Sequence, residues 1–92
     1  MSRTYLNKIN YIGTLKTCLQ AREDFADLTY HRDSHGKEYL ILSDIIGQIG
    51  IFDITGYSEE MIFHTIAIIE CGKRPANMIT DRSERLRIAK LR

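Results

Sequence analysis

Residues 28–54 read LTYHRDSHGKEYLILSDIIGQIGIFDI, and this stretch decides the fold. Polarity alternates with a period of two over residues 28–33, which predicts a β-strand. The turn cluster DSHG follows, with Gly36 expected at positive φ, and the run EYLILS at residues 38–43 predicts a second strand. A turn near residues 43–47 leads to QIGIFDI, whose apolar residues fall on both alternations, as in a strand covered on both faces or poorly covered on one. We therefore predict a three-stranded antiparallel meander, whose third strand is weakened by Gly47 and Gly50, both candidates for a β-bulge.

Upstream of the meander, the apolar residues recur every three or four positions, which predicts an amphipathic helix with Thr4 as its N-cap. The apolar stripe consists of Tyr5, Ile9, Ile12, Leu15 and Leu19, with Ala26 extending it. The opposite face is expected to be solvated and carries Asn7, Asn10, Thr14, Thr17 and Ala21. Gly13 interrupts the helix at a cost of about 1 kcal/mol relative to alanine. A tolerated weakness is the favoured interpretation, and a kink or a close backbone contact is the alternative.

Downstream of the meander, Ser58 followed by Glu59 and Glu60 is typical of a helix start. This second helix is expected to reach about Cys71 and to end at Gly72. Apolar residues occupy most of its circumference, which indicates burial on more than one side: Met61, Ile62, Phe63, Ile66, Ala67, Ile68, Ile69 and Cys71. We expect it to lie between the sheet and either the first helix or a partner.

The last segment, residues 81–92, is predicted as a short helix that begins near Thr80. The alternative is a fourth strand over residues 84–88 that pairs at the sheet edge, because polarity alternates there as well. The predicted class is therefore α+β: a three-stranded antiparallel meander flanked by an N-terminal and a C-terminal helix, with a short basic C-terminal segment. We expect a single domain, with residues 1–72 forming the core and residues 73–92 forming a basic appendage.

The sequence contains no arrangement of residues that is typical of an enzyme, a cofactor site or a metal site. Phosphate-binding glycine loops and zinc-ligand spacings are absent, and the three histidines are dispersed. Cys18 and Cys71 fall within apolar helical patterns, which favours buried free thiols over a disulfide. Since the chain also lacks a secretory signal and any apolar run long enough to span a bilayer, we predict a non-catalytic cytoplasmic protein without a cofactor or a metal.

The charge of the chain is strongly polarised. Residues 73–92 carry seven positive and two negative side chains, a net charge of +5, whereas residues 1–72 carry six positive and ten negative side chains, a net charge of −4. Basic clusters attract the phosphates of nucleic acids or acidic protein surfaces. The alternative is that these cations pair with the acidic residues of the core. The predicted binding residues are Lys73, Arg74, Arg82, Arg85, Arg87, Lys90 and Arg92.

In length, in element order and in the absence of a catalytic motif, the whole chain resembles the small anti-CRISPR proteins of bacteriophages. This resemblance implies that the chain acts in the host bacterial cell and binds a CRISPR surveillance complex, a Cas protein with its guide RNA, to block hybridisation of target DNA. Many members of that group are acidic DNA mimics, and the basic tail of this chain departs from that pattern. It favours contact with guide RNA or with acidic patches nearby, with Ser34 and His35 at the hairpin turn as a second contact.

Two other classes stay open. A small dimeric DNA-binding regulator would use the same basic tail on duplex DNA alone. A structural or assembly protein would make no nucleic-acid contact and would form a homodimer through the exposed apolar part of the second helix.

Overall fold

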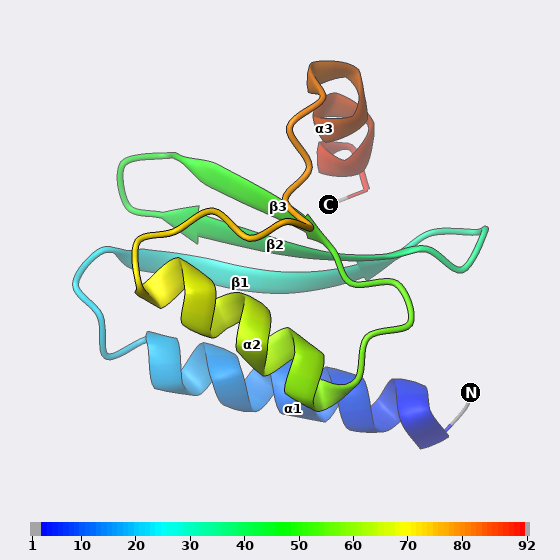
Figure 1. The fold of residues 1–92 in the computed structure, drawn as a ribbon, viewed down its shortest axis with the longest axis horizontal. Helices are drawn as coiled ribbons and strands as arrows, with labels where there is room; N and C mark the ends of the chain where they lie inside the picture. Colours follow the sequence, from blue (N-terminus) through cyan, green and yellow to red (C-terminus); the bar gives the residue numbers. More distant parts are fainter. Residues whose placement is uncertain (1–2, 92) are drawn as a thin grey trace.

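A computed structural model of the chain describes residues 3–91, with side chains described from residue 7 onward. The strands form one antiparallel sheet in the order β1-β2-β3, as the predicted meander requires. Helices α1 and α2 cover one face of the sheet, and α3 covers the other (Figure 1). The elements in chain order are α1 (Arg3–Leu19), β1 (Phe25–Arg32), β2 (Glu38–Asp44), β3 (Ile49–Asp53), α2 (Glu59–Glu70) and α3 (Arg82–Ala89). The α+β class is confirmed.

The two hairpin turns are built in the same way from the pattern Asp-x-x-Gly-x. In the first, Asp33 Oδ1 accepts hydrogen bonds from the N–H groups of His35 and Lys37, both over 2.9 Å, and Gly36 has φ +80°. In the second, residues 44–48 repeat the arrangement, with the aspartate accepting from two N–H groups and the glycine at φ +91°. Because an aspartate side chain fixes the start of each turn and a glycine its left-handed residue, these ten residues set the register of the sheet.

The alternation of the strands divides the apolar residues between two clusters. The larger cluster lies between the sheet and helices α1 and α2; its buried members are Ile12, Leu15, Leu19, Leu28, Leu40, Phe52, Ile54, Ile62 and Ile66. The smaller cluster lies under α3 and consists of Tyr39, Ile41, Ile51 and Ile88. Strand β3 contributes Phe52 to one cluster and Ile51 to the other, which confirms a strand covered on both faces.

Helices α1 and α2 run parallel and side by side (Figure 1). Near the start of α2, burial and then the carboxylate of Glu59 raise the pKa of Tyr11 on α1. Near its end, Arg22 donates from Nη1 to Glu70 Oε1 over 2.5 Å. The first pair links α1 to the start of α2, and the second links the turn after α1 to the end of α2. Helix α2 was expected to be buried on more than one side, between the sheet and the first helix or a partner. It buries Ile62 and Ile66 in the core shared with α1, whereas Phe63 is 56% exposed and Met61 47% exposed.

Several details of α1 and of the strands differ from the prediction. The helix begins at Arg3, so Thr4 lies inside it and is not its N-cap, and Ala26 is exposed on β1 because the helix ends at Leu19. The buried stripe is also rotated: Lys8 is 5% exposed, whereas Ile9 is 37% exposed. The irregularity in the sheet lies between Phe25 and Asp27 on β1, not at the glycines of β3. Gly13 is confirmed as a tolerated weakness, because α1 continues through it and no atom lies within 4 Å of an added Cβ.

Residues 77–79, which we call the edge strap, run along the free edge of β3 and join α2 to α3. The N–H of Asp53 donates to the carbonyl of Asn77 over 3.0 Å, and the N–H of Ile79 donates to the carbonyl of Ile51 over 2.8 Å. Met78 forms a bridge with Phe52 between these bonds. The edge strap therefore occupies the sheet edge where the alternative prediction placed a fourth strand over residues 84–88. Residues 84–88 belong to helix α3, which confirms the favoured prediction of a short helix.

Candidate nucleic-acid interface

The basic tail is fixed to the sheet by helix α3. Asp81 caps the helix by accepting a hydrogen bond from the N–H of Glu84 over 2.9 Å. One turn later, Ile88 is fully buried against Tyr39, Ile41 and Ile51. A single buried isoleucine is a small contact area for an eight-residue helix, so polar contacts must complete the attachment.

Two of the predicted binding residues supply those contacts. Arg85 donates from Nη2 to the carbonyl of Ile49 over 2.6 Å and from Nη1 to the carbonyl of Ile79 over 3.2 Å. Arg87 donates to Tyr39 Oη over 3.1 Å, and its guanidinium lies 5.9 Å from the centroid of the same ring. The hydrogen bonds to Tyr39 and Glu84 raise the pKa of Arg87. These two arginines therefore hold α3 in place.

The hairpin turn with Ser34 and His35 lies next to α3. Both side chains are exposed, and the turn is linked to the helix by Arg87 Nη1, which lies 3.9 Å from Asp33 Oδ2. Burial alone raises the pKa of Asp33, but the hydrogen bonds from the N–H groups of Lys37 and His35, helped by the charges of His35 and Arg87, outweigh it and lower the pKa overall. The two candidate contacts that were predicted separately thus belong to one side of the molecule.

The remaining cations fall into two groups. Arg82 and Lys90 are exposed at the two ends of α3, and Lys73 and Arg74 are exposed after the end of α2. Within residues 3–91, none of these four side chains has a hydrogen bond or an ion pair. The edge strap separates the two groups, because it carries the chain from the α2 face of the sheet to the α3 face (Figure 1). Arg92, the seventh predicted residue, lies outside the described residues.

The outward side of α3 is a stripe opposite Ile88. Arg82, Leu86 and Lys90 follow each other at intervals of four residues, so they lie on one side of the helix. Leu86 is 56% exposed between the two cations. With a rise of 1.5 Å per residue, the charges are about 12 Å apart along the helix axis. We call Arg82, Leu86 and Lys90 the α3 stripe.

A polar cluster inside the fold was missed by the sequence analysis. Lys8 donates to both carboxylate oxygens of Glu38 over 2.9 Å, Tyr30 donates to Glu38 Oε2, and the N–H of Gly56 donates to Oε1 over 2.9 Å. Burial alone raises the pKa of Glu38, but these hydrogen bonds and the Lys8 charge outweigh it and lower the pKa. The cluster ties α1, β1, β2 and the turn before α2 together. The helical spacing could have revealed this cluster, because Lys8 lies four residues before Ile12 and therefore on the same side of α1.

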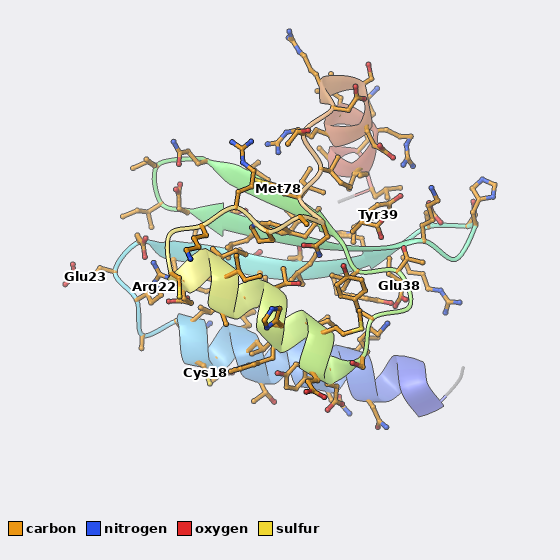
Figure 2. All side chains as sticks on the ribbon, viewed as in Figure 1. Cys18, Arg22, Glu23, Glu38, Tyr39 and Met78 are labelled. Carbon is orange, nitrogen blue, oxygen red and sulfur yellow. The ribbon has the colours of Figure 1, made fainter. Side chains whose placement is uncertain are left out.

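The polar cluster around Glu38 and the contacts of α3 lie on opposite faces of the sheet. Figure 2 shows Glu38 on the side of α1 and α2 and the neighbouring Tyr39 on the side of α3. Consecutive residues of a strand point to opposite faces, so one dipeptide carries an anchor for each layer. Both anchors are structural, and both are buried.

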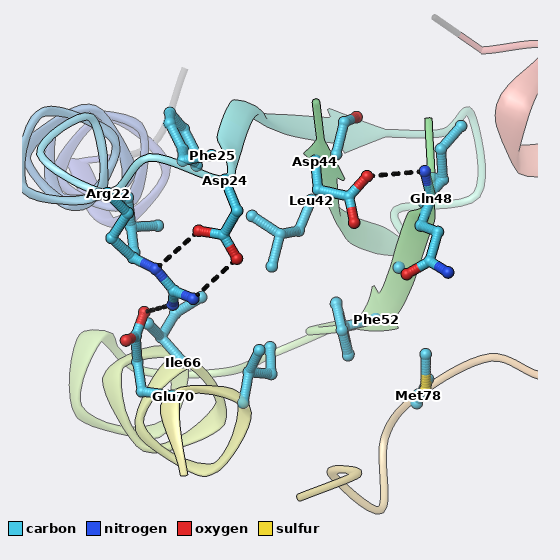
Figure 3. A pocket seen from close by; sticks show the side chains of 15 residues that line it. Arg22, Asp24, Phe25, Leu42, Asp44, Gln48, Phe52, Ile66, Glu70 and Met78 are labelled. Carbon is cyan, nitrogen blue, oxygen red and sulfur yellow. Dashed lines mark hydrogen bonds and ion pairs between the residues drawn. The ribbon is translucent and has the colours of Figure 1, made fainter. Parts of the chain in front are cut away.

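A hollow of about 270 Å³ opens where α1 and α2 end against the sheet. Figure 3 shows Arg22 at its rim between Asp24 and Glu70, with Leu42, Phe52 and Met78 among the apolar lining residues. The hydrogen bond to Glu70 is the first cause of the raised pKa of Arg22. At the rim Arg22 pairs with both Asp24 and Glu70, and Asp44 accepts hydrogen bonds from the N–H groups of Ile46 and Gln48.

The described residues also give no support for a metal site or a disulfide. No three histidine, cysteine, aspartate or glutamate side chains among residues 3–91 are grouped to hold a metal ion. Cys18 and Cys71 are free, as predicted, but both are exposed, so the expectation of buried thiols is wrong. Cys18 lies outside the narrow buried stripe of α1, and Cys71 is the C-cap where α2 ends.

Every helix in the part of the chain that the structure describes is too short or too polar to cross a membrane. No family model, curated protein or solved structure matches this chain.

Proposed function

We propose that this chain is a non-catalytic binding protein that attaches to the phosphates of a ribonucleoprotein through the α3 stripe. The single observation that carries the proposal is the pair of exposed cations, Arg82 and Lys90, which have no partner within residues 3–91 and are held on a helix that is itself fixed. Because the backbone of α3 is already fixed, binding costs conformational freedom mainly in the two side chains, and more of their attraction to phosphates remains as affinity.

The surroundings of the α3 stripe support the same proposal. The β1–β2 turn, with Ser34 and His35 exposed, extends the surface, and Leu86 offers an apolar contact for a base or a protein side chain. Arg85 and Arg87 contribute positive potential without being free to move, since both are bonded to the sheet. Ser34 and His35 therefore stay in the proposed site as neighbours, and Arg85 and Arg87 stay in it as positioning residues.

The narrower proposal is that the ribonucleoprotein is a bacterial CRISPR surveillance complex and that binding blocks hybridisation of target DNA. It rests on the whole-chain resemblance to anti-CRISPR proteins and on a basic surface suited to guide RNA. The alternatives, a dimeric DNA-binding regulator and an assembly protein without nucleic-acid contact, differ in what the α3 stripe binds.

The test compares two charge reversals of equal size. One variant carries Arg82→Glu and Lys90→Glu, and the matched control carries Lys73→Glu and Arg74→Glu. Binding to a fluorescein-labelled guide RNA, alone and assembled with its Cas proteins, is measured by fluorescence anisotropy over a range of salt concentrations. We expect the first variant to lower the slope of log K against log salt by about 1.4–1.8, for two lost phosphate contacts, and the control to leave it nearly unchanged.

Equal losses in the two variants would overturn the α3 stripe as the binding site, since they would reflect net charge alone. Binding to duplex DNA but to neither RNA sample would favour the regulator. Tight binding to the assembled complex together with loss of target-DNA hybridisation would support the narrower proposal.

A further inference from the structure

The outward side of α2 is a second surface without a partner, on the face of the sheet opposite to α3. Glu60, Phe63, His64, Ala67, Ile68 and Cys71 follow the spacing of a helix stripe that faces away from the sheet, and Ile62, Thr65 and Ile66 occupy the buried side. Phe63 is more than half exposed, although α2 is the most apolar helix of the chain. We call these six residues the α2 outer stripe.

The charges at the two ends of α2 are opposite. Glu59 and Glu60 form its first turn, and Lys73 and Arg74 follow its last turn directly; all four are exposed. The side chains of Glu60, Lys73 and Arg74 make no hydrogen bond or ion pair to any side chain or backbone group among the described residues. Two copies of α2 that pack antiparallel would bring the acidic end of each beside the basic end of the other, whereas parallel packing would place like charges together.

The sequence of the α2 outer stripe fits this arrangement residue by residue. A two-fold axis at Ala67 places Ala67 opposite its own copy and Phe63 opposite Cys71 of the second copy. The same axis places Glu60 level with Arg74 of the second copy. Small residues at the centre let two helices approach closely, and the aromatic ring fills the space beside the small thiol.

We infer that the α2 outer stripe is the interface of an antiparallel homodimer with a two-fold axis at Ala67. The interface is isologous, so each contact occurs twice. The open groove of about 670 Å³ between α2 and residues 75–77, lined by Met61, Ile68 and Pro75, borders the stripe and gives the second copy a wider surface to cover. Because α3 lies on the other face of the sheet, the dimer leaves the α3 stripe free, and this inference does not depend on the proposed function.

Because a single helix from each copy forms the contact, we expect a weak dimer with a dissociation constant in about the micromolar range. Sedimentation velocity of the full chain between about 1 and 500 µM should therefore show a shift from 10.7 kDa to twice that mass. A single species of 10.7 kDa over the whole range would overturn the inference.

The decisive experiment exploits the symmetry. Glu60→Lys and Arg74→Glu should each raise the dissociation constant about tenfold or more when studied alone, because each creates two pairs of like charges across the axis. An equimolar mixture of the two variants should form a heterodimer, because each altered charge then meets an opposite one. Glu23→Lys, an equal change on the exposed loop after α1, is the control and should leave the dissociation constant unchanged.

A cross-linking experiment tests the axis itself. Ala67→Cys in a Cys18→Ser, Cys71→Ser background should form a covalent dimer under mild oxidation, because residue 67 meets its own copy. Glu23→Cys in the same background is the matched control and should stay monomeric. If the charge variants leave the dissociation constant unchanged, or if both cysteine variants cross-link equally, the interface lies elsewhere and the inference is wrong.

Discussion

Replacing Glu38 by glutamine should destabilise this protein by about 3–5 kcal/mol, because it would leave the ammonium group of Lys8 buried without a counter-charge. Lys8 is 5% exposed and Glu38 is 9% exposed, so water cannot replace the lost carboxylate. Tyr30 and the N–H of Gly56 would also lose an acceptor of full charge. Breaking one side of a buried ion pair costs more than the pair contributes, since the remaining charge keeps its desolvation penalty.

This loss can be compared with the total free energy of unfolding of the chain. At about 0.05–0.15 kcal/mol per residue, a chain of 92 residues has about 5–14 kcal/mol of stability, so the substitution removes about a fifth or more of it. For a domain of this size a loss of 1 kcal/mol lowers Tm by about 4–8 °C, so the expected drop exceeds 12 °C.

The assay is urea unfolding followed by far-UV circular dichroism at neutral pH, with Glu38→Gln, Lys8→Met and the double variant. The double variant removes both charges and should lie within about 2 kcal/mol of the original chain, because an uncharged pair carries no unpaired buried ion. Glu84→Gln serves as control: it breaks the exposed pair with Arg87 and should cost less than about 1 kcal/mol. Simple additivity of the two single changes would refute the reasoning.

The remaining predictions concern pH, two glycines, a cap and the basic tail. The folded-state pKa of Glu38 lies below its ordinary value of 4.5. The stability that the ionised carboxylate contributes is therefore fully present above pH 4.5 and is lost as the pH falls through the folded-state pKa. Because Glu38→Gln lacks this carboxylate, it should lose less stability than the original chain between about pH 6 and pH 3. Gly13→Ala should stabilise by about 1 kcal/mol in thermal unfolding, because its Cβ meets no atom within 4 Å, and an unchanged or lower Tm would contradict the helix model. Gly50→Ala should destabilise by about 1–3 kcal/mol in the same assay, because its Cβ would lie 2.9 Å from Cζ of the buried Phe52 ring. Ser58→Ala should cost about 1 kcal/mol by removing the cap of α2, and Ser58→Asp should restore it. Arg85→Glu should lower the urea midpoint by removing both bonds from α3 to carbonyl groups, whereas Arg82→Glu should leave it unchanged, and equal effects would show that Arg85 is not a structural anchor.

The sheet could be predicted because its determinants are local. Alternating strands and two Asp-x-x-Gly turns specify a meander within 30 residues, and Ser58 caps α2 through its own neighbours. The buried side of α1 could not be predicted in the same way. Lys8 is acceptable in the core only because Glu38, 30 residues later in the sequence, forms an ion pair with it. Hydrophobicity alone would place Ile9, and not Lys8, on the buried side of α1.

The binding site could be predicted only in part from the sequence, because the roles of its cations also depend on residues far away in the sequence. Seven cations within 20 residues suggest one patch, but the edge strap moves Lys73 and Arg74 away from Arg82 and Lys90, and carbonyl groups of Ile49 and Ile79 engage Arg85. Which cations are structural therefore depends on contacts between segments far apart in sequence.

The edge strap also has a consequence for the order in which the chain folds. The face of the sheet that carries Tyr39, Ile41 and Ile51 is complete once residue 53 has been synthesised, yet its cover, Ile88, comes 35 residues later. During synthesis this apolar face is exposed until the strap has passed the edge of β3 and α3 has docked, and exposed apolar faces on partly folded chains are sites of aggregation. A chain that stops before α3 would keep that face permanently open, so the last helix protects the nascent sheet as well as carrying its charge.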